Sequence, residues 1–194
     1  MSKMLPSSRP QISRARTLEI LKQNGIDLAV VKLAIIGIRG YYLDTMGAPG
    51  KNDRGVYDDC IVVITDKVHF AFNANTDPSS FRPRTKSKQG MATLEVGVHW
   101  YRRGNHGISR PGGGYPAFRP ANPEEKLPVS RDGEPGTSWG IAINIHRGSL
   151  SSTSSEGCQT LYPPQWNEFK KLVDGEMTRT GVSRFPYVLV AERR

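Results

Sequence analysis

The chain has 194 residues, and its 27 lysines and arginines against 18 aspartates and glutamates give a net charge of +9. This length suits one domain with a full core and is short for two. Two cysteines allow at most one disulfide, which excludes a disulfide-stapled scaffold. The 20 glycines and 14 prolines favour a fold with many turns and few long helices.

The N-terminal part predicts a loose segment followed by one short helix. Residues 1–13 are polar and rich in proline and serine, while two leucines stand at helical spacing within Arg14–Gln23. The Asn-Gly pair that follows is a suitable helix end. We therefore expect a flexible N-terminus with a short helix over residues 1–25, and a single domain over residues 26–194.

The sequence contains no segment typical of a leader or a membrane span. The N-terminal region lacks the apolar core of a signal peptide. The longest apolar-rich run, residues 28–38, contains a lysine and is too short to cross a bilayer. We therefore expect no transmembrane segment, and a protein that is made and folded in the cytosol.

The remaining segments predict a mostly β fold with a few short helices, of the α+β class. Apolar runs and turn residues indicate the elements. In chain order these are a helix in the first half of residues 26–38, two strands within 60–74, a strand pair or bent strand at 92–103, a strand at 139–146 in which three isoleucines alternate to one face, a helix begun by prolines at 163–176, and a strand at 185–192. Residues 104–135 are dense in glycine, proline and charge, which predicts a long irregular excursion with a functional role.

The positive charge has two interpretations. Basic residues gather between positions 81 and 110 and again at the C-terminus. A solvated basic face explains them, and so does an anionic partner such as nucleic acid or a cell envelope. Nucleic-acid binding needs a basic stripe on a recognisable module or aromatic residues interleaved for stacking. Because the sequence offers neither, we expect no nucleic-acid partner.

The two cysteines stand in different surroundings. Cys60 lies in the apolar run DDCIVVI, which is typical of a thiol in a core. Cys158 follows a tract of serine, threonine and glycine that begins after His146, at the polar-face end of a predicted strand. A cysteine attacks as a thiolate, so it needs a base and backbone N–H groups that hold the oxyanion. We predict His146 as the base and the N–H groups of Gly157 and Cys158 as the donors, with a backbone carbonyl or hydroxyl in residues 147–149, or a carboxylate, orienting the imidazole.

The pattern His-x-Gly, followed by Ser-x-Gly-Cys, resembles the active-site motif of the L,D-transpeptidase catalytic-domain family. The matching residues are His146, Gly148, Ser155, Gly157 and Cys158. The second half of the chain is loosely similar as well, with a glycine-rich excursion, a strand that leads into the histidine, and a Pro/Trp helix after the cysteine. Sequence segments such as HGISRPGGGYPAFR are also similar to segments of small phage-encoded proteins of this kind.

The resemblance implies a β-sandwich or barrel catalytic domain that forms a cysteine acyl-enzyme on bacterial peptidoglycan stem peptides. Cleavage would follow the L-centre of a diamino acid, commonly meso-diaminopimelate. Cys158 would be the nucleophile, His146 the base that later protonates the leaving amine, and Gly157 part of the oxyanion hole. Arg147 and Gly148 would complete the catalytic segment.

Further substrate contacts are expected beside this catalytic segment. Within the motif, Ser155 would shape the turn that meets the substrate. Arg110 can form a bidentate pair with a stem-peptide carboxylate. A carboxylate at Glu156 near an incoming amine would favour hydrolysis over transfer. The other expected substrate-binding residues are His106 and Tyr115 in the excursion, and Gln159 and Thr160, where the chain departs from the family pattern.

The leading interpretation is a peptidoglycan-degrading cysteine peptidase of phage endolysin type, held in the host cytoplasm until it is released to the cell wall. It would act as a monomer without a cofactor, and its charge would help it meet the anionic envelope. Two alternatives remain, an L,D-transpeptidase that cross-links stem peptides and a non-catalytic basic phage structural or binding protein. A zinc site would need His99, His106, His146 and Cys158, whose spacing matches no compact ligand motif, so no metal is expected.

Overall fold

The computed structural model describes residues 5–109 and 111–192 and has the expected mostly β, α+β character. Its helices are α1 (Arg14–Gln23), α2 (Leu28–Val31) and α3 (Pro163–Thr180). Its strands are β1 (Leu33–Arg39), β2 (Asp59–Thr65), β3 (His69–Asn75), β4 (Ala92–Leu94), β5 (Gly97–His106), β6 (Tyr115–Pro120), β7 (Lys126–Arg131), β8 (Glu134–Ile141), β9 (Ile145–Arg147), β10 (Gln159–Leu161) and β11 (Arg184–Ala191).

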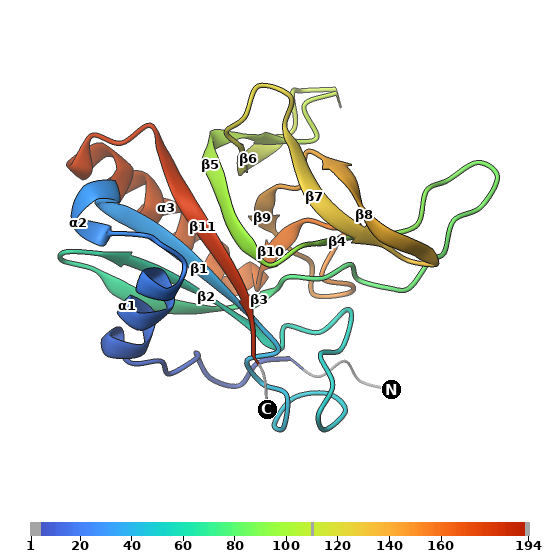
Figure 1. The fold of residues 1–194 in the computed structure, drawn as a ribbon, viewed down its shortest axis with the longest axis horizontal. Coiled ribbons are helices and arrows are strands. Elements are labelled where there is room, and N and C mark those ends of the chain that lie inside the picture. Colours follow the sequence, from blue (N-terminus) through green and yellow to red (C-terminus); the bar gives the residue numbers. More distant parts are fainter. Residues whose placement is uncertain (1–4, 110, 193–194) are drawn as a thin grey trace.

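Eight strands close into a barrel in the order β1-β11-β5-β6-β9-β10-β3-β2, and β4, β7 and β8 form a separate small sheet. Most barrel neighbours are antiparallel, while β1 with β11 and β9 with β10 are parallel. Figure 1 shows the small sheet beside the barrel, on the side away from α1 and α2. The fold therefore consists of a barrel and a small sheet, and the chain passes from β8 of the small sheet to β9 of the barrel.

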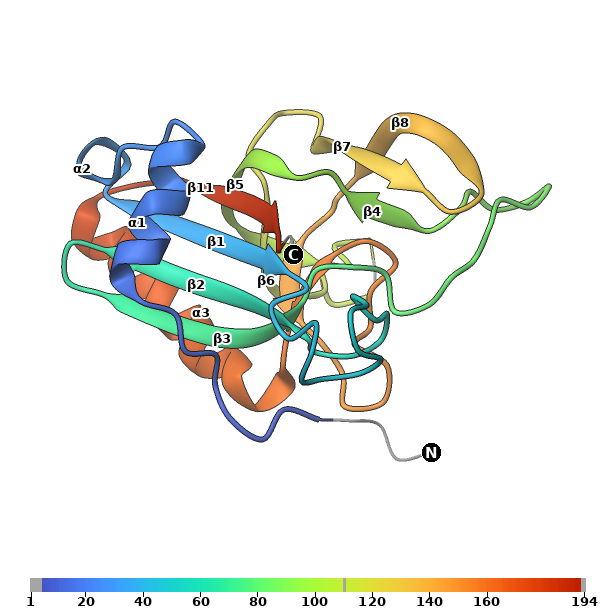
Figure 2. The same ribbon diagram turned by 60° about the horizontal axis from the view of Figure 1, so that its bottom comes forward.

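Strands β1 and β2 are buried on both faces, which explains why their sequences are continuously apolar rather than alternating. Ile35 points into a core cluster that also contains Phe169 and Val173 of α3. Its neighbour Ile36 points into a second cluster, which contains Leu21 of α1. Figure 2 shows α1 lying across the outer face of β1 and β2, so the N-terminal helix covers barrel surface.

The helix boundaries follow ordinary capping signals. Ser13 caps α1 by accepting a hydrogen bond from the Arg16 N–H, and the helix ends at Asn24, as expected. Helix α3 begins with proline in its first turn and ends at Gly181, whose φ is +71°. It extends beyond the predicted segment because Met177 adds another buried side chain to the face that packs on the barrel.

The segment predicted as a long irregular excursion, residues 104–135, is instead largely strand. It contains the end of β5, all of β6 and β7, and the start of β8. These strands were not predicted because they contain prolines, which are rare within strands. Pro116 and Pro120 lie in β6, and Pro128 lies in β7. Residues 92–103, expected as a strand pair or a bent strand, form β4 and most of β5, which lie in different sheets and do not pair with each other.

The predicted continuous strand at 139–146 is broken. Ile141 ends β8 and is 66% exposed, whereas Ile143 and Ile145 are buried. The break lies at Ala142, whose φ of +53° no regular strand accommodates. Alternation along one strand therefore does not describe the three isoleucines, because the chain passes from the small sheet to the barrel between them.

Within the described ranges, none of the three helices has the length and apolar character needed to cross a bilayer. Cys60 is fully buried on β2 among the side chains beneath α1, the core position that its sequence context predicts.

Candidate active site

The tract from His146 to Cys158 folds so that both residues reach one point of the barrel. Strand β9 carries His146 and pairs in parallel with β10, which begins directly after Cys158. The connection turns through positive φ values at Thr153, Ser154 and Gly157. The serine-rich tract thus forms the crossover that brings the chain back to start β10 parallel to β9 (Figure 1).

Two further residues come from the β5–β6 hairpin. His106 ends β5 and lies opposite Tyr115, the first residue of β6. The His106 and His146 rings stack with their centroids 4.1 Å apart. The metal-binding or nucleophilic atoms of His106, His146 and Cys158 all lie within 4.8 Å of one another. The structure thus brings together four of the residues predicted from the sequence.

Hydrogen bonds hold the His146 ring in one orientation. Its Nδ1 lies 2.7 Å from the carbonyl oxygen of Arg147 and 3.1 Å from the Tyr115 hydroxyl. A carbonyl only accepts, so Nδ1 carries the proton and Nε2 holds the basic lone pair. Among the orienting groups considered from the sequence, the structure uses the backbone carbonyl of Arg147.

Cys158 is a protonated thiol at neutral pH. Burial, followed by the nearby carboxylate of Glu156, raises the pKa of Cys158 to about 11, even though the Asn144 N–H and the Arg119 guanidinium favour the thiolate. Only 8% of the residue is exposed. A nucleophilic thiolate therefore requires transfer of the proton to a base, and the adjacent His146 can accept it.

Two residues that the sequence did not single out contact the sulfur. The backbone N–H of Asn144 points at Cys158 Sγ over 3.4 Å, and the Ala142 carbonyl accepts from the thiol over 3.7 Å. The Asn144 side chain also reaches His106, with Nδ2 3.1 Å from Nδ1. Both residues lie in the break between β8 and β9, where Ala142 has a φ of +53°.

The predicted pair of oxyanion donors needs a correction. The Gly157 N–H donates to the Ser155 hydroxyl over 3.0 Å, and that hydroxyl donates to the Cys158 carbonyl over 2.7 Å. Both groups are therefore used inside the turn and are not available to a substrate oxyanion. Among the described residues, the N–H of Cys158 has no acceptor, which leaves it as the donor at this point.

A cavity of about 530 Å³ opens beside Cys158. Its wall on the small sheet carries Trp139 and Ile141, which are 65% and 66% exposed, and Arg131. Glu156 lines the same cavity and pairs with Arg82 over 3.0 Å. The opening thus combines an apolar surface with one cation that forms no ion pair among the described residues, Arg131.

Two expected substrate contacts are not made. Gln159 is fully buried, where its amide binds the Gly157 carbonyl and accepts from the Tyr187 hydroxyl. Thr160 is also fully buried in β10. Both face the barrel because β10 has no solvent-exposed side, and this corrects the prediction. Gly148 serves close packing, since a Cβ there would lie 2.1 Å from the Tyr57 hydroxyl. Arg110 lies outside the described residues.

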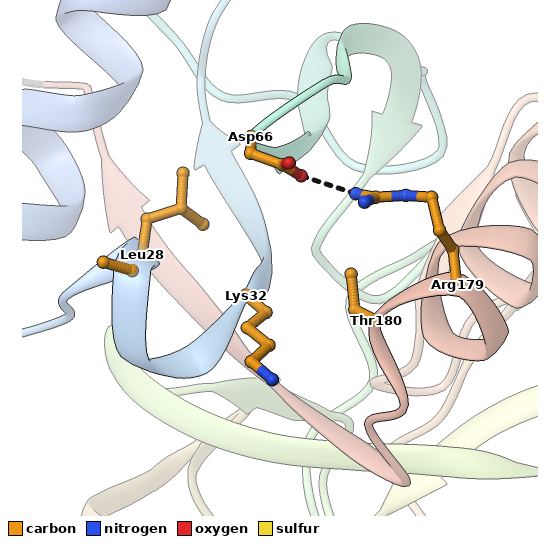
Figure 3. Close-up of a pocket in the computed structure, with 6 residues that line it drawn as sticks. Leu28, Lys32, Asp66, Arg179 and Thr180 are labelled. Carbon is orange, nitrogen blue, oxygen red and sulfur yellow. Dashed lines mark hydrogen bonds and ion pairs between the residues drawn. The ribbon is translucent and has the colours of Figure 1, made fainter.

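A separate pocket lies between α2, the β2–β3 turn and the end of α3, and Figure 3 shows the residues that line it. Arg179 pairs with Asp66 across this pocket, and Glu176 also binds Arg179. It shares no lining residue with the Cys158 cavity. Because its ion pairs are made within the protein, the Cys158 cavity is the stronger candidate for a functional site.

The chain was compared with models of protein families, with curated proteins and with solved structures, and none of the three comparisons finds a match.

Proposed function

We propose that this chain is a cysteine acyl-transfer enzyme that hydrolyses peptide bonds in the stem peptides of bacterial peptidoglycan. One observation carries the proposal: Cys158 lies beside an imidazole whose Nδ1 is held by a backbone carbonyl, at the edge of a substrate-sized cavity. This is the arrangement that a thiol nucleophile needs for activation. The resemblance of the surrounding motif to L,D-transpeptidases supplies the substrate class and the expected catalytic-domain type.

The chemistry proceeds in two balanced steps. His146 Nε2 takes the Cys158 proton as Sγ attacks the carbonyl carbon, and the oxyanion faces the Cys158 N–H. The carbon–nitrogen bond then breaks, His146 returns the proton to the leaving amine, and a thioester remains on Cys158. Water, deprotonated by His146, attacks the thioester, which releases the new carboxylate and restores the thiol.

The cavity chemistry suits a stem peptide. Such a peptide carries carboxylates, which Arg131 can meet, and alkyl side chains, which Trp139 and Ile141 can cover. Glu156 stands near the opening, but its ion pair with Arg82 offsets part of its charge. This pairing weakens the argument that Glu156 alone excludes an amine, so transfer to an amine, as in a transpeptidase, stays the second possibility within the same mechanism.

A phage lysis role is part of the same proposal. The net charge of +9 would favour contact with an anionic cell envelope once the protein reaches it. The similarity of several sequence segments to small phage-encoded proteins supports a lysin that is stored in the host cytoplasm and released at lysis. This lysin would act as a monomer.

Digestion of purified cell walls in the presence of hydroxylamine tests the proposal. A thioester intermediate predicts that mass spectrometry will find new carboxyl termini without hydroxylamine, and hydroxamates at the same bond when it is added. Hydroxamates that form at unchanged total turnover would show that the acyl-enzyme precedes the water step. Cell walls that stay intact with the wild-type protein would contradict it and would favour a non-catalytic basic protein.

A further inference from the structure

The three residues at the candidate site form a potential metal-ligand set that the nucleophile mechanism does not require. His106 contributes nothing to thiol activation in that mechanism, yet its ring stacks on His146 and its ligand atom lies within 4.8 Å of those of His146 and Cys158. Two imidazoles and a thiolate are ligands that Zn²⁺ favours. We propose that this set binds one Zn²⁺, and that the bound ion reversibly blocks the cysteine enzyme.

The separations are close to what zinc requires. Zinc bonds of about 2.1 Å to nitrogen and about 2.3 Å to sulfur place tetrahedral ligand atoms roughly 3.4–3.6 Å apart. The largest separation among the three atoms must therefore shorten by a little over 1 Å from 4.8 Å. His106 is half-buried at a strand end, so rotation of its side chain can supply this movement.

The hydrogen bonds around His146 leave its Nε2 lone pair directed at the proposed zinc site. A zinc-bound histidine usually donates its other N–H to a carbonyl or carboxylate, which fixes the ring and raises its basicity. The Arg147 carbonyl already holds Nδ1 of His146 in this way. His146 Nε2 is then the atom that coordinates zinc.

Asn144 can do the same for His106. Its amide lies 3.1 Å from His106 Nδ1, and its Oδ1 is buried with no hydrogen-bond partner among the described residues. A half-turn of the amide exchanges its oxygen and nitrogen, so that Asn144 Oδ1 accepts a hydrogen bond from the N–H at His106 Nδ1. His106 Nε2 then keeps its lone pair for the zinc ion. The fourth zinc position faces the cavity, where a water molecule can occupy it.

Inhibition by zinc rests on the proposed function, because it needs Cys158 and His146 to be the nucleophile and the base. Binding of the zinc ion does not rest on it. Zinc would hold Cys158 as a bound thiolate and would occupy the lone pair of His146, so neither the nucleophile nor the base would be available. Removal of the ion by a chelator would restore both. The site would then keep the enzyme inactive wherever zinc exceeds the dissociation constant.

Cobalt substitution tests the binding step directly. Metal-free protein titrated with Co²⁺ should take up one equivalent and develop a thiolate-to-cobalt charge-transfer band together with the visible bands of tetrahedral Co²⁺; Zn²⁺ should displace the cobalt and bleach both. Cys158→Ala should lose the charge-transfer band, and His106→Gln should weaken binding by at least ~10-fold. His99→Gln is the matched control, because the His99 ring binds the Glu95 carbonyl instead and its variant should titrate like the wild type.

Each alternative result is informative. A charge-transfer band that survives in Cys158→Ala, or unchanged affinity in His106→Gln with native circular dichroism, would overturn the three-ligand site. Activity on cell walls should fall by at least ~10-fold at saturating Zn²⁺ and return with a chelator. Full activity of the zinc-loaded protein would overturn the block. Activity that requires zinc would overturn the block and the metal-free cysteine mechanism together, while leaving the binding site in place.

Discussion

At the scale of single residues, the burial of Cys158 sets the chemistry. The raised pKa keeps the thiol protonated, so its reactivity depends on His146 rather than on a free thiolate. The local groups that favour the thiolate, the Asn144 N–H and Arg119, offset only part of the desolvation. The site is therefore inert toward electrophiles until a base takes the proton.

This dependence predicts a distinctive pH profile of alkylation. In His146→Ala, the rate at which iodoacetamide modifies Cys158 should rise about tenfold per pH unit up to about pH 10 without a plateau, because the thiol titrates near 11. The wild type should react faster at about pH 7. Peptide mapping separates Cys158 from the buried Cys60. A plateau below about pH 9 in the variant would contradict the assigned surroundings of the sulfur.

Gly157 fixes the backbone next to Cys158, the proposed nucleophile. A Cβ at this position would lie 2.7 Å from the Ala92 carbonyl oxygen, and the φ of +146° disfavours any side chain. Gly157→Ala should lower the free energy of unfolding by about 1–3 kcal/mol and reduce kcat/KM as Cys158 shifts. Gly175→Ala is the control: its Cβ meets nothing within 4 Å, and the helix should gain up to about 1 kcal/mol. Wild-type stability and activity in Gly157→Ala would refute this role.

Among the helices and strands, the sequence predicted those whose boundaries are set by nearby capping and turn residues. Helix α1 has its serine cap and its stop residue, and β2 and β3 flank a turn at Asp66-Lys67, so these elements lie where expected. Strands β6 and β7 were missed because they contain prolines and owe their existence to pairing with distant partners. Such pairing depends on tertiary contacts that a window of residues does not contain.

The same division applies to the site. His146 and Cys158 were predictable because both lie in one continuous tract. His146 ends the predicted strand, and Cys158 follows a glycine. Asn144 and Ala142 were not, because their approach to the sulfur depends on one positive φ value between two sheets. Gln159 was misjudged because proximity in sequence to Cys158 says nothing about which way β10 points its side chains.

In the proposed enzyme the small sheet would form one wall of the substrate site, and Arg131 of β7 is the cation that lines this wall. The guanidinium donates to the carbonyls of Gly90 and Trp139 and to Ser138, all neutral acceptors. Arg131→Ala should therefore raise KM for a stem peptide by about 5–10-fold with a smaller change in kcat.

Two further variants separate charge from packing at this wall. Arg131→Lys keeps the charge and should recover part of the KM, more so at low salt. Arg184→Ala removes an arginine that lies over the Trp100 ring on β5 and is the control, with KM unchanged. An unchanged KM in Arg131→Ala would mean that the substrate carboxylate binds elsewhere.

At the scale of the whole molecule, buried carboxylates tie stability to pH. Asp58 and Asp59 are each 1% exposed, and burial followed by repulsion from neighbouring carboxylates raises the pKa of both. A raised folded-state pKa means that the folded protein binds the proton more tightly than the unfolded chain. The resulting stability is fully present below the unfolded pKa of about 4 and is lost as pH rises through the folded values.

The free energy of unfolding should therefore fall as pH rises from about 5 to about 9. Asp58→Asn should flatten this slope, since the amide carries no charge and can still accept from the Asp53 N–H. Asp66→Asn should leave the slope intact, because Asp66 is exposed and Arg179 lowers its pKa instead. Denaturant unfolding across this range measures all three proteins, and equal slopes in the wild type and Asp58→Asn would disprove the assignment.

Two cysteine variants show whether Cys158 is the nucleophile of a metal-free enzyme. Rates of stem-peptide cleavage by Cys158→Ala and Cys60→Ala are measured side by side in chelator-treated buffer. We predict that Cys158→Ala loses at least ~10³-fold in kcat/KM, because no other group replaces the attacking sulfur. Cys60→Ala should stay within a few-fold of the wild type. Cleavage by Cys158→Ala at a rate close to that of Cys60→Ala would mean that Cys158 is not the nucleophile.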